Sequence, residues 1–529
     1  MHESLFSYPS GRFLYNEELR IRERHVPFDV AALQNTIAQD VGHGSVKSMI
    51  KLSEGGFNRV LLATMEDGFK AIVKIPYWIS VPKTYASASE VATLTFLRSK
   101  GKPVPEVYGW SSTNDNAAGV EYIIMEHASG VGAETCWFDT TKYQKKALVT
   151  GIVDIEKRLF EIPFASVGSL YFKSDLPSEL QGRLYQPGTP DEDRDSETYC
   201  IGPTADYMFW YGQRATLELD RGLWSDPQRN IFLQLPTKKS SGPSSLGSPL
   251  SYLEIAPYLL PKDPRNMLNQ PTLRHPGVFS SPILTLGFID ANLNTKDLTP
   301  SNVFVCPDTF NVTSIIDWQH TAITPLLLTA GYPRLFENPD PEPPTGLVPP
   351  KYPEDYDKMN PQDKAQVDEL IRRQSLFYLY RVFNGGLNKV HLKALQEPLI
   401  LARQNLVESA SRQWTGNLMT LRGNLMRMCQ IWPHVPRKDE NTECPIQFSE
   451  QEVKEHIENE PMWYDLNKLV NHWRDELGGL SEEGWVRAEQ YDHAVKRNAS
   501  LKAEFSGGSA DELEKIDRGW PFQDREELF

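Results

Sequence analysis

Short apolar runs bounded by glycine and acidic residues lie between residues 46 and 75 and predict three β-strands. The runs are Val46 to Leu52, Arg59 to Met65 and Phe69 to Ile75. Asp67-Gly68 separates the last two, and an Asp-Gly pair between apolar runs is a strong signal for a tight hairpin turn. This part of the chain is therefore expected to be β-rich.

A helix is predicted to follow these strands. It starts near Ser87, and Glu90, Leu94 and Leu97 lie at positions i, i+4 and i+7, which is the spacing of one side of an α-helix. Gly101 ends the pattern.

Two further apolar runs, residues 104–110 and 121–126, predict two more strands after the helix. Residues 46–127 are thus expected to form an N-terminal lobe that is rich in β-strands and contains one inserted helix. Residues 1–45 would precede this lobe as an N-terminal extension.

The rest of the chain is expected to form a larger, mainly helical lobe, residues 128–475. Residues 139–161 carry an apolar stripe at helical spacing, and residues 362–475 are mostly helical in pattern. The charged tail, residues 476–529, is expected to form helices with little apolar surface. Four stretches are interpreted as insertions: 174–195, 237–250, 277–296 and 337–364.

The charge balance limits the classes of partner. The chain has 529 residues with 55 Lys and Arg against 70 Asp and Glu, a net charge of −15. General nucleic-acid binders and proteins that bind anionic membranes need a basic face, so neither class is expected. A local basic pocket for a phosphate remains compatible with this balance.

Cysteine usage and hydropathy indicate an intracellular protein. The five cysteines are scattered without metal-ligand spacing, so neither a disulfide framework nor a zinc site is predicted. The chain has no apolar run of about 18 residues, and no membrane span is expected. Its first residues do not have the pattern of a signal peptide. The oligomeric state is left open.

Glycines and a lysine in the predicted N-terminal lobe point to phosphate binding. Gly55 and Gly56 lie between two strands, where backbone amides can approach a phosphate. Lys74 lies in an apolar strand and needs a partner, and Glu90 is 16 residues later on the predicted helix. Such an ion pair holds a lysine on the α- and β-phosphates of a nucleotide. Taken singly, each of these features is also ordinary in a strand turn, a strand end or a helix surface.

A second group of polar residues lies near position 300 and has the composition of a magnesium and phosphoryl-transfer site. Asp297 and Asn302 are five residues apart in a loop that leads into a strand, and Asp317 ends the returning strand. Phosphoryl transfer from Mg-ATP needs one Asp to orient or deprotonate the acceptor hydroxyl, and an Asn and a second Asp to hold Mg²⁺. The glycine pair, Lys74, Glu90 and this polar group occur in the order that such a site needs, which argues against coincidence.

Several further segments complete a series that is characteristic of one superfamily. The chain resembles the kinase-like aminoglycoside phosphotransferase superfamily from about Leu5 to about residue 475, and within it a fungal branch that includes altered inheritance of mitochondria protein nine. An Ile-Asp-Trp where protein kinases have Asp-Phe-Gly is typical of this superfamily. The segments that carry the resemblance are Ser10–Glu18, Lys74–Pro76, Ala88–Thr93, Pro103–Pro105, Tyr122–Glu126, Gly168–Phe172 and Ile316–His320.

The resemblance implies an α+β, protein-kinase-like fold of two lobes and a Mg-ATP-dependent phosphotransferase that acts on a hydroxyl of an unidentified small molecule. It also implies a mitochondrial location, with the cytoplasm as the alternative. Carried over to this sequence, it gives Lys74 to the phosphates with Glu90 as its partner. It also gives Glu126, His127 and Ala128 to the hinge against the adenine, Asp297 the role of catalytic base, and Asn302 and Asp317 the role of magnesium ligands.

The catalytic loop departs from the family pattern in one way. The family has a histidine two residues before the catalytic Asp, but Thr295 stands there. Joining Pro276 directly to Asp297 restores the pattern, with His275 as the residue that supports the loop from within. We interpret the 20 intervening residues, 277–296, as a retained intron or mis-annotated exon, and a genuine lineage-specific loop is the alternative.

This interruption leaves a second function open. A misplacement of about 1 Å in a reacting group costs ~100-fold in rate, so the split loop favours a pseudokinase or scaffold that binds nucleotide without turnover. A protein kinase is disfavoured, since the chain has no Asp-Phe-Gly. The acceptor pocket is expected near an aromatic cluster whose alternative role is core packing: Tyr207, Phe209, Trp210 and Tyr211.

Overall fold

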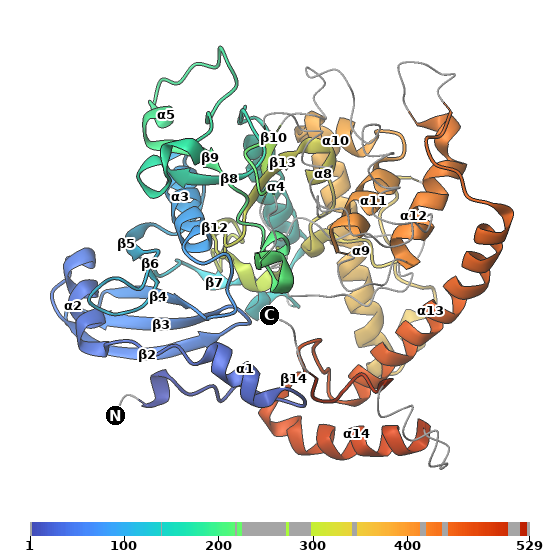
Figure 1. Ribbon diagram of the computed structural model, residues 1–529, viewed down its shortest axis with the longest axis horizontal. Helices are drawn as coiled ribbons and strands as arrows, with labels where there is room; N and C mark the ends of the chain where they lie inside the picture. The colour runs from blue at the N-terminus through green and yellow to red at the C-terminus, as the bar shows by residue number, and fades with distance from the viewer. Residues whose placement is uncertain are drawn as a thin grey trace.

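The computed structural model describes most of the chain. The described residues are 3–138, 140–216, 220–224, 271–274, 298–340, 346–412, 419–435, 443–505 and 519–525. The expected insertions 237–250 and 277–296 lie outside these residues. A lobe built on a β-sheet lies beside a larger, mainly helical lobe, as the sequence predicts (Figure 1).

The sheet of the N-terminal lobe has five strands in the order β2-β3-β4-β6-β5. All four pairings are antiparallel, and the three strands expected between residues 46 and 75 and the two expected after the helix are all present. The strands are β2 (Val46–Glu54), β3 (Asn58–Met65), β4 (Lys70–Pro76), β5 (Val107–Ser111) and β6 (Tyr122–Glu126).

The inserted helix, α3 (Tyr85–Ser99), is buried on nearly all sides. Val91 packs against Ile123 and Met125 of the sheet, while Phe96 and its neighbours belong to the core of the helical lobe. Because α3 is held from both sides, a polar side chain on it is fixed in a dry environment between the two lobes.

The N-terminal segment packs into the core of the β-rich lobe. It forms β1 (Gly11–Phe13), α1 (Glu17–Arg24) and α2 (Val30–Val41), and Leu33 and Ile37 are completely buried. Arg59 of β3 is also fully buried, and its guanidinium donates at 3.2 Å to backbone carbonyls of this segment, those of Phe6, Arg24 and Val26. The extension therefore supports the strand that follows Gly55-Gly56.

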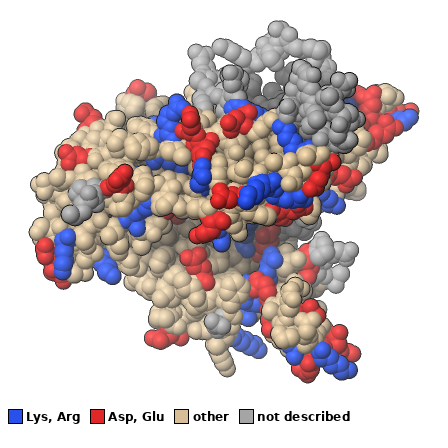
Figure 2. Space-filling model, turned by 90° about the horizontal axis from the view of Figure 1, so that it is seen from below, with Lys and Arg blue, Asp and Glu red and all other residues tan. Residues whose placement is uncertain are grey.

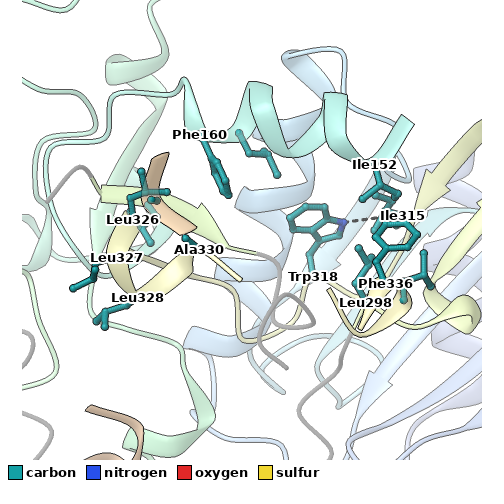
Figure 3. Packing of buried hydrophobic residues seen from close by; sticks show 14 of the residues in the cluster. Ile152, Phe160, Leu298, Ile315, Trp318, Leu326, Leu327, Leu328, Ala330 and Phe336 are labelled. Atoms are coloured by element: carbon teal, nitrogen blue, oxygen red, sulfur yellow. Dashed lines mark hydrogen bonds between the residues drawn. The ribbon is translucent and has the colours of Figure 1, made fainter. Parts of the chain in front are cut away.

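The helical lobe has one large hydrophobic core, part of which is shown in Figure 3. The helices expected from residues 139–161 and 362–475 are present. The helices are α4 (Lys142–Phe160), α5 (Asp195–Thr198), α8 (Leu326–Thr329), α9 (Pro361–Leu387), α10 (Lys389–Leu395), α11 (Ile400–Arg412), α12 (Met419–Gln430) and α13 (Glu450–Glu476). The strands are β7 (Val131–Gly132), β8 (Ser169–Phe172), β9 (Tyr199–Gly202), β10 (Pro271–Arg274), β11 (Val303–Val305), β12 (Val312–Ile315) and β13 (Ala322–Pro325).

The C-terminal tail has its own hydrophobic core, so the expectation of little apolar surface was wrong. The core joins the end of α13 to β14 (Trp485–Arg487), to α14 (Tyr491–Phe505) and to Trp520 and Phe522. These apolar residues are widely spaced among charged ones, which hid them from a periodicity argument. β14 pairs with β1 in an antiparallel sheet, so the C-terminal tail is attached to the N-terminal segment.

The surface carries charges of both signs. On the face shown in Figure 2, acidic and basic side chains are interspersed among the tan surface of other residues. Within the described part of the chain, no helix is long and apolar enough to cross a membrane.

Candidate active site

A buried lysine at the centre of the sheet lies between two carboxylates from different parts of the chain. Lys74 is on β4 and is 6 % exposed. Its Nζ lies 2.7 and 2.8 Å from the two carboxylate oxygens of Glu90 on α3, and 3.0 Å from Oδ1 of Asp317. The ion pair between Lys74 and Glu90 that the sequence suggests is therefore present.

The electrostatics of this cluster favour a charged lysine. Burial alone would lower the pKa of Lys74, but the carboxylates of Glu90 and Asp317 outweigh burial and raise that pKa. One ammonium therefore contacts two carboxylate groups from different parts of the chain.

Asp317 has an unusual backbone conformation. Its φ of 66° lies in the left-handed region, which residues other than glycine rarely adopt. The following residue, Trp318, is buried in the core of the helical lobe, and its indole nitrogen donates to the carbonyl of Ile315 at 2.9 Å (Figure 3). This anchor holds the turn that directs the Asp317 side chain toward Lys74.

The two residues expected to bind magnesium belong to the two chain segments at the open end of one hairpin. β11 and β12 pair antiparallel with Val303 opposite Ile315. One step further out, the backbone N–H of Ile316 donates to the carbonyl of Asn302 at 3.0 Å. Asn302 is therefore next to Asp317 in space although 15 positions separate them in the sequence.

The loop between β2 and β3 has two glycines that packing does not require. A Cβ added at Gly56 would meet no atom within 4 Å, and one added at Gly55 would meet only the carbonyl oxygen of Asn58, at 3.7 Å. Neither glycine has a positive φ. Neither packing nor backbone conformation requires glycine here, and the two glycines leave open space along the loop.

A buried chain of polar side chains ties this loop to the segment after Asp317. The amide nitrogen of Asn58 donates to Oε1 of Gln319 at 2.7 Å, and Nε2 of Gln319 donates to Oγ of Ser80 at 2.5 Å. All three residues are buried. Beside them, the ring of Phe57 packs against His320 and Tyr207. We call the hydrogen-bonded residues Asn58, Gln319 and Ser80 the amide bridge.

No local pattern in the sequence predicts the amide bridge. Gln319 lies in the Ile316–His320 segment that carries the resemblance, and this was the only signal for it. Its partners are 261 and 239 positions away, so no local pattern indicates them.

Comparison with known proteins gives relatives over nearly the whole chain. No family model matches the sequence. A subtelomeric hrmA-associated cluster protein of Aspergillus fumigatus is 30 % identical over 531 aligned residues, covering 90 % of this chain and 97 % of that protein. The chain belongs to this family. The mitochondrial altered inheritance of mitochondria protein 9 of Yarrowia lipolytica is 24 % identical, over 93 % of this chain and 86 % of that protein.

Solved kinase-like structures are more distantly similar to this chain. A putative fructosamine-3-kinase from Thermobifida fusca is 13 % identical and covers 75 % of this chain and 98 % of its own, with a TM-score of 0.36. The ADP-bound aminoglycoside phosphotransferase APH(2'')-Ib is 11 % identical over 75 % of this chain and 97 % of its own, with a TM-score of 0.35. The kinase-like fold of this chain is seen in its own five-stranded sheet, in α3 and in the Lys74–Glu90 ion pair.

In the expected hinge, the side chain of Glu126 is engaged in contacts within the fold. The carboxylate of Glu126 accepts from Arg98 at 2.8 Å and from the backbone N–H of Glu106 at 3.1 Å, and its own N–H donates to the carbonyl of Glu106 at 2.8 Å. His127 is exposed and Ala128 is buried. Contacts to an adenine at this hinge would thus fall to the backbone of His127 and Ala128.

The aromatic cluster expected near an acceptor pocket serves packing in large part. Tyr207 and Phe209 are buried, and Tyr207 stacks on Tyr211 with ring centroids 5.0 Å apart. Tyr207 belongs to the core of the β-rich lobe. The core-packing alternative therefore describes Tyr207 and Phe209.

Two site residues of the catalytic loop lie outside the described residues. These are His275 and Asp297, together with the segment 277–296 between them. Leu298, which directly follows Asp297, is buried in the same core cluster as Trp318 (Figure 3). No group of three or more His, Cys, Asp or Glu residues with the arrangement of a metal site occurs among the described residues.

Proposed function

We propose that this protein is a Mg-ATP-dependent phosphotransferase whose acceptor is the hydroxyl of a small molecule. The observation that carries the proposal is the buried Lys74 held between Glu90 and Asp317. A lysine oriented by a helix glutamate beside a metal-binding aspartate is the arrangement that protein kinases use for phosphoryl transfer.

The donor set fits a magnesium nucleotide. The carboxylate of Asp317 and the amide oxygen of Asn302 are hard oxygen groups, and a backbone hydrogen bond from Ile316 to Asn302 brings their chain segments together. Mg²⁺ prefers such ligands together with phosphate oxygens and water. Bound Mg²⁺ would neutralise charge on the phosphates. Lys74 would bind the α- and β-phosphates, and the amides of Gly55 and Gly56 would bind them as well.

The remaining roles belong to the catalytic loop and the hinge. Asp297 would orient or deprotonate the acceptor hydroxyl, and His275 would support the loop that carries it. Backbone groups of His127 and Ala128 would bind the adenine edge. The relatives named altered inheritance of mitochondria protein 9 are described as mitochondrial, which supports the mitochondrion as the location of this protein.

The test is thermal stabilisation by Mg-ATP, on the chain as it stands and on a version without residues 277–296. A ligand present at 100 times its Kd adds ~2.7 kcal/mol to the free energy of unfolding, which is readily seen as a rise in Tm. Stabilisation of both versions supports a tolerated loop, and stabilisation of the shortened version alone means that the segment disables the site. If neither version responds, the phosphotransferase proposal fails.

The interrupted catalytic loop favours one alternative, a pseudokinase or scaffold that binds nucleotide without turnover. Asp297→Ala and Asp317→Ala distinguish the two functions. An enzyme loses product formation with either substitution, whereas a nucleotide-gated scaffold loses its function only with Asp317→Ala, which removes a metal ligand.

A further inference from the structure

Two cysteines meet where the last helices of the large lobe join. Cys429 lies at the end of α12, and Cys444 lies in the segment that leads into α13. Their Sγ atoms are 3.5 Å apart, and both side chains are partly accessible. The remaining three cysteines, Cys136, Cys200 and Cys306, are also free thiols.

Packed residues hold the two thiols in place from both sides. The Sγ of Cys429 also lies 3.7 Å from the carbonyl of Ile446, which is buried in the large core. Met428, beside Cys429 on α12, is buried in the same core. Because neighbours of each cysteine are anchored, the contact is a built feature of the fold. A disulfide needs the sulfur atoms to approach to ~2.05 Å, a movement within reach of side-chain rotation.

We propose that Cys429 and Cys444 form a reversible disulfide and so constitute an oxidative modification site of this protein. The oxidant is a peroxide. It converts one thiol to a sulfenic acid with release of water, and the second thiol then displaces a second water to form the S–S bond. A dithiol reductant returns both thiols by exchange.

The surroundings of Cys429 affect its reactivity toward peroxide. Burial, and then the neighbouring Cys444, raise the pKa of the Cys429 thiol. A thiolate is the form that peroxide oxidises, so this raised pKa slows the first step at Cys429.

The disulfide would close a loop around the turn between the two helices. This loop contains the 3-10 turn Trp432–His434 and fixes the start of α13, whose far end enters the core of the C-terminal tail. A covalent closure restricts the unfolded chain more than the folded one. The oxidised protein is therefore expected to have a higher Tm than the reduced protein.

The experiment is intact-mass analysis and peptide mapping after treatment of the full chain with stoichiometric hydrogen peroxide. It is best done with Cys306→Ser, because Cys306 is an accessible turn cysteine whose pKa is lowered by hydrogen bonds from Thr309 and Asp308, and it would compete for oxidant. The expected result is a loss of about 2 Da, a Cys429–Cys444 cross-linked peptide and reversal by dithiothreitol.

The control variants locate the bond. Cys136→Ser is expected to leave the cross-link intact, while Cys429→Ser and Cys444→Ser each abolish it. A sulfenic-acid trap should label Cys444 in the Cys429→Ser protein. The proposal is overturned if both cysteines remain open to alkylation after peroxide treatment, or if the cross-link maps to other cysteines.

Discussion

Lys74 is a buried cation that contacts two carboxylates. Substituting it should therefore lower the free energy of unfolding mainly through the loss of its charge. Lys74→Met leaves Glu90 buried without its cation, and breaking a buried pair on one side costs about 3–5 kcal/mol. We expect Lys74→Met to destabilise the protein by about that amount, as measured by denaturant unfolding.

A second substitution separates charge from packing. Adding Glu90→Gln to Lys74→Met removes the uncompensated carboxylate, so the double variant should recover part of the lost stability. Lys70→Met is the matched control, because Lys70 lies on the same strand but is exposed. Equal losses for Lys70→Met and Lys74→Met would contradict the account.

Glu156 on α4 gives the molecule a pH dependence. Burial raises the pKa of this carboxyl to about 8, although the hydroxyl of Tyr380 donates to it at 2.7 Å. The folded protein then keeps a proton that the unfolded chain loses near pH 4.5, so this group makes stability fall as the pH rises toward 8. Burial lowers the pKa of nearby His391 to about 3, and this acts in the opposite direction, only below pH 6.5.

Between pH 6.5 and 8, Glu156 dominates the pH dependence of stability, because the effect of His391 acts below pH 6.5. Over this interval the free energy of unfolding should fall by about 1–2 kcal/mol. Glu156→Gln has no proton to lose and should make the stability flat over the same interval. Urea unfolding at several pH values measures this, and an unchanged slope in the variant would mean that another group is responsible.

At the scale of elements, the amide bridge connects the glycine-containing loop with the segment after Asp317. Gln319→Leu leaves the buried polar groups of Asn58 and Ser80 without a partner, at a cost of ~1–3 kcal/mol each. We expect this variant to lose stability and to show a weaker Mg-ATP response, because the loop is no longer held over the phosphates.

Gln404→Leu is the control for a general loss of stability. Gln404 is also buried, and its Nε2 donates to carbonyls of Leu327 and Ala330 in the large core. It should destabilise the protein while leaving the Mg-ATP response unchanged. Thermal-shift measurements of the two variants with and without nucleotide test whether Gln319 positions the glycine-containing loop. An equal loss of the Mg-ATP response in both variants would exclude this role.

The elements that the sequence predicts are those with a local signal. β3 and β4 are bounded by Gly56 and by Asp67-Gly68, and the strand-to-helix spacing brings Lys74 close to Glu90. The amide bridge and the carbonyl contacts of Arg59 join residues far apart in the sequence, so neither periodicity nor turn chemistry indicates them. The positions of Asp297 and His275 stay a prediction.

At the scale of the whole molecule, the two ends of the chain close on each other. β1 pairs with β14, the backbone N–H of Asn16 donates to Asp524, and Arg24 forms an ion pair with Glu483. The same N-terminal segment supports β3 through Arg59. The tail is thereby linked to the strand that starts at the glycine-containing loop.

Gly11 is the point where this closure is most sensitive to size. A Cβ at Gly11 would overlap the indole of Trp485 on the paired strand. Gly11→Val should separate β1 from β14 and lower the Tm. Gly346→Val is the control, because a Cβ at Gly346 meets no atom within 4 Å. Equal melting of the two variants in a thermal scan would show that the terminal pairing contributes little.

The most direct measurement of the central claim is the Kd of Mg-ATP by calorimetry, for the unaltered chain, Asp317→Asn and the exposed control Lys70→Met. The account predicts binding that requires Mg²⁺, is lost or weakened at least ~10-fold by Asp317→Asn and is unchanged by Lys70→Met. Binding that is equally tight in all three proteins, or that is independent of Mg²⁺, would contradict a nucleotide site at Lys74 and Asp317.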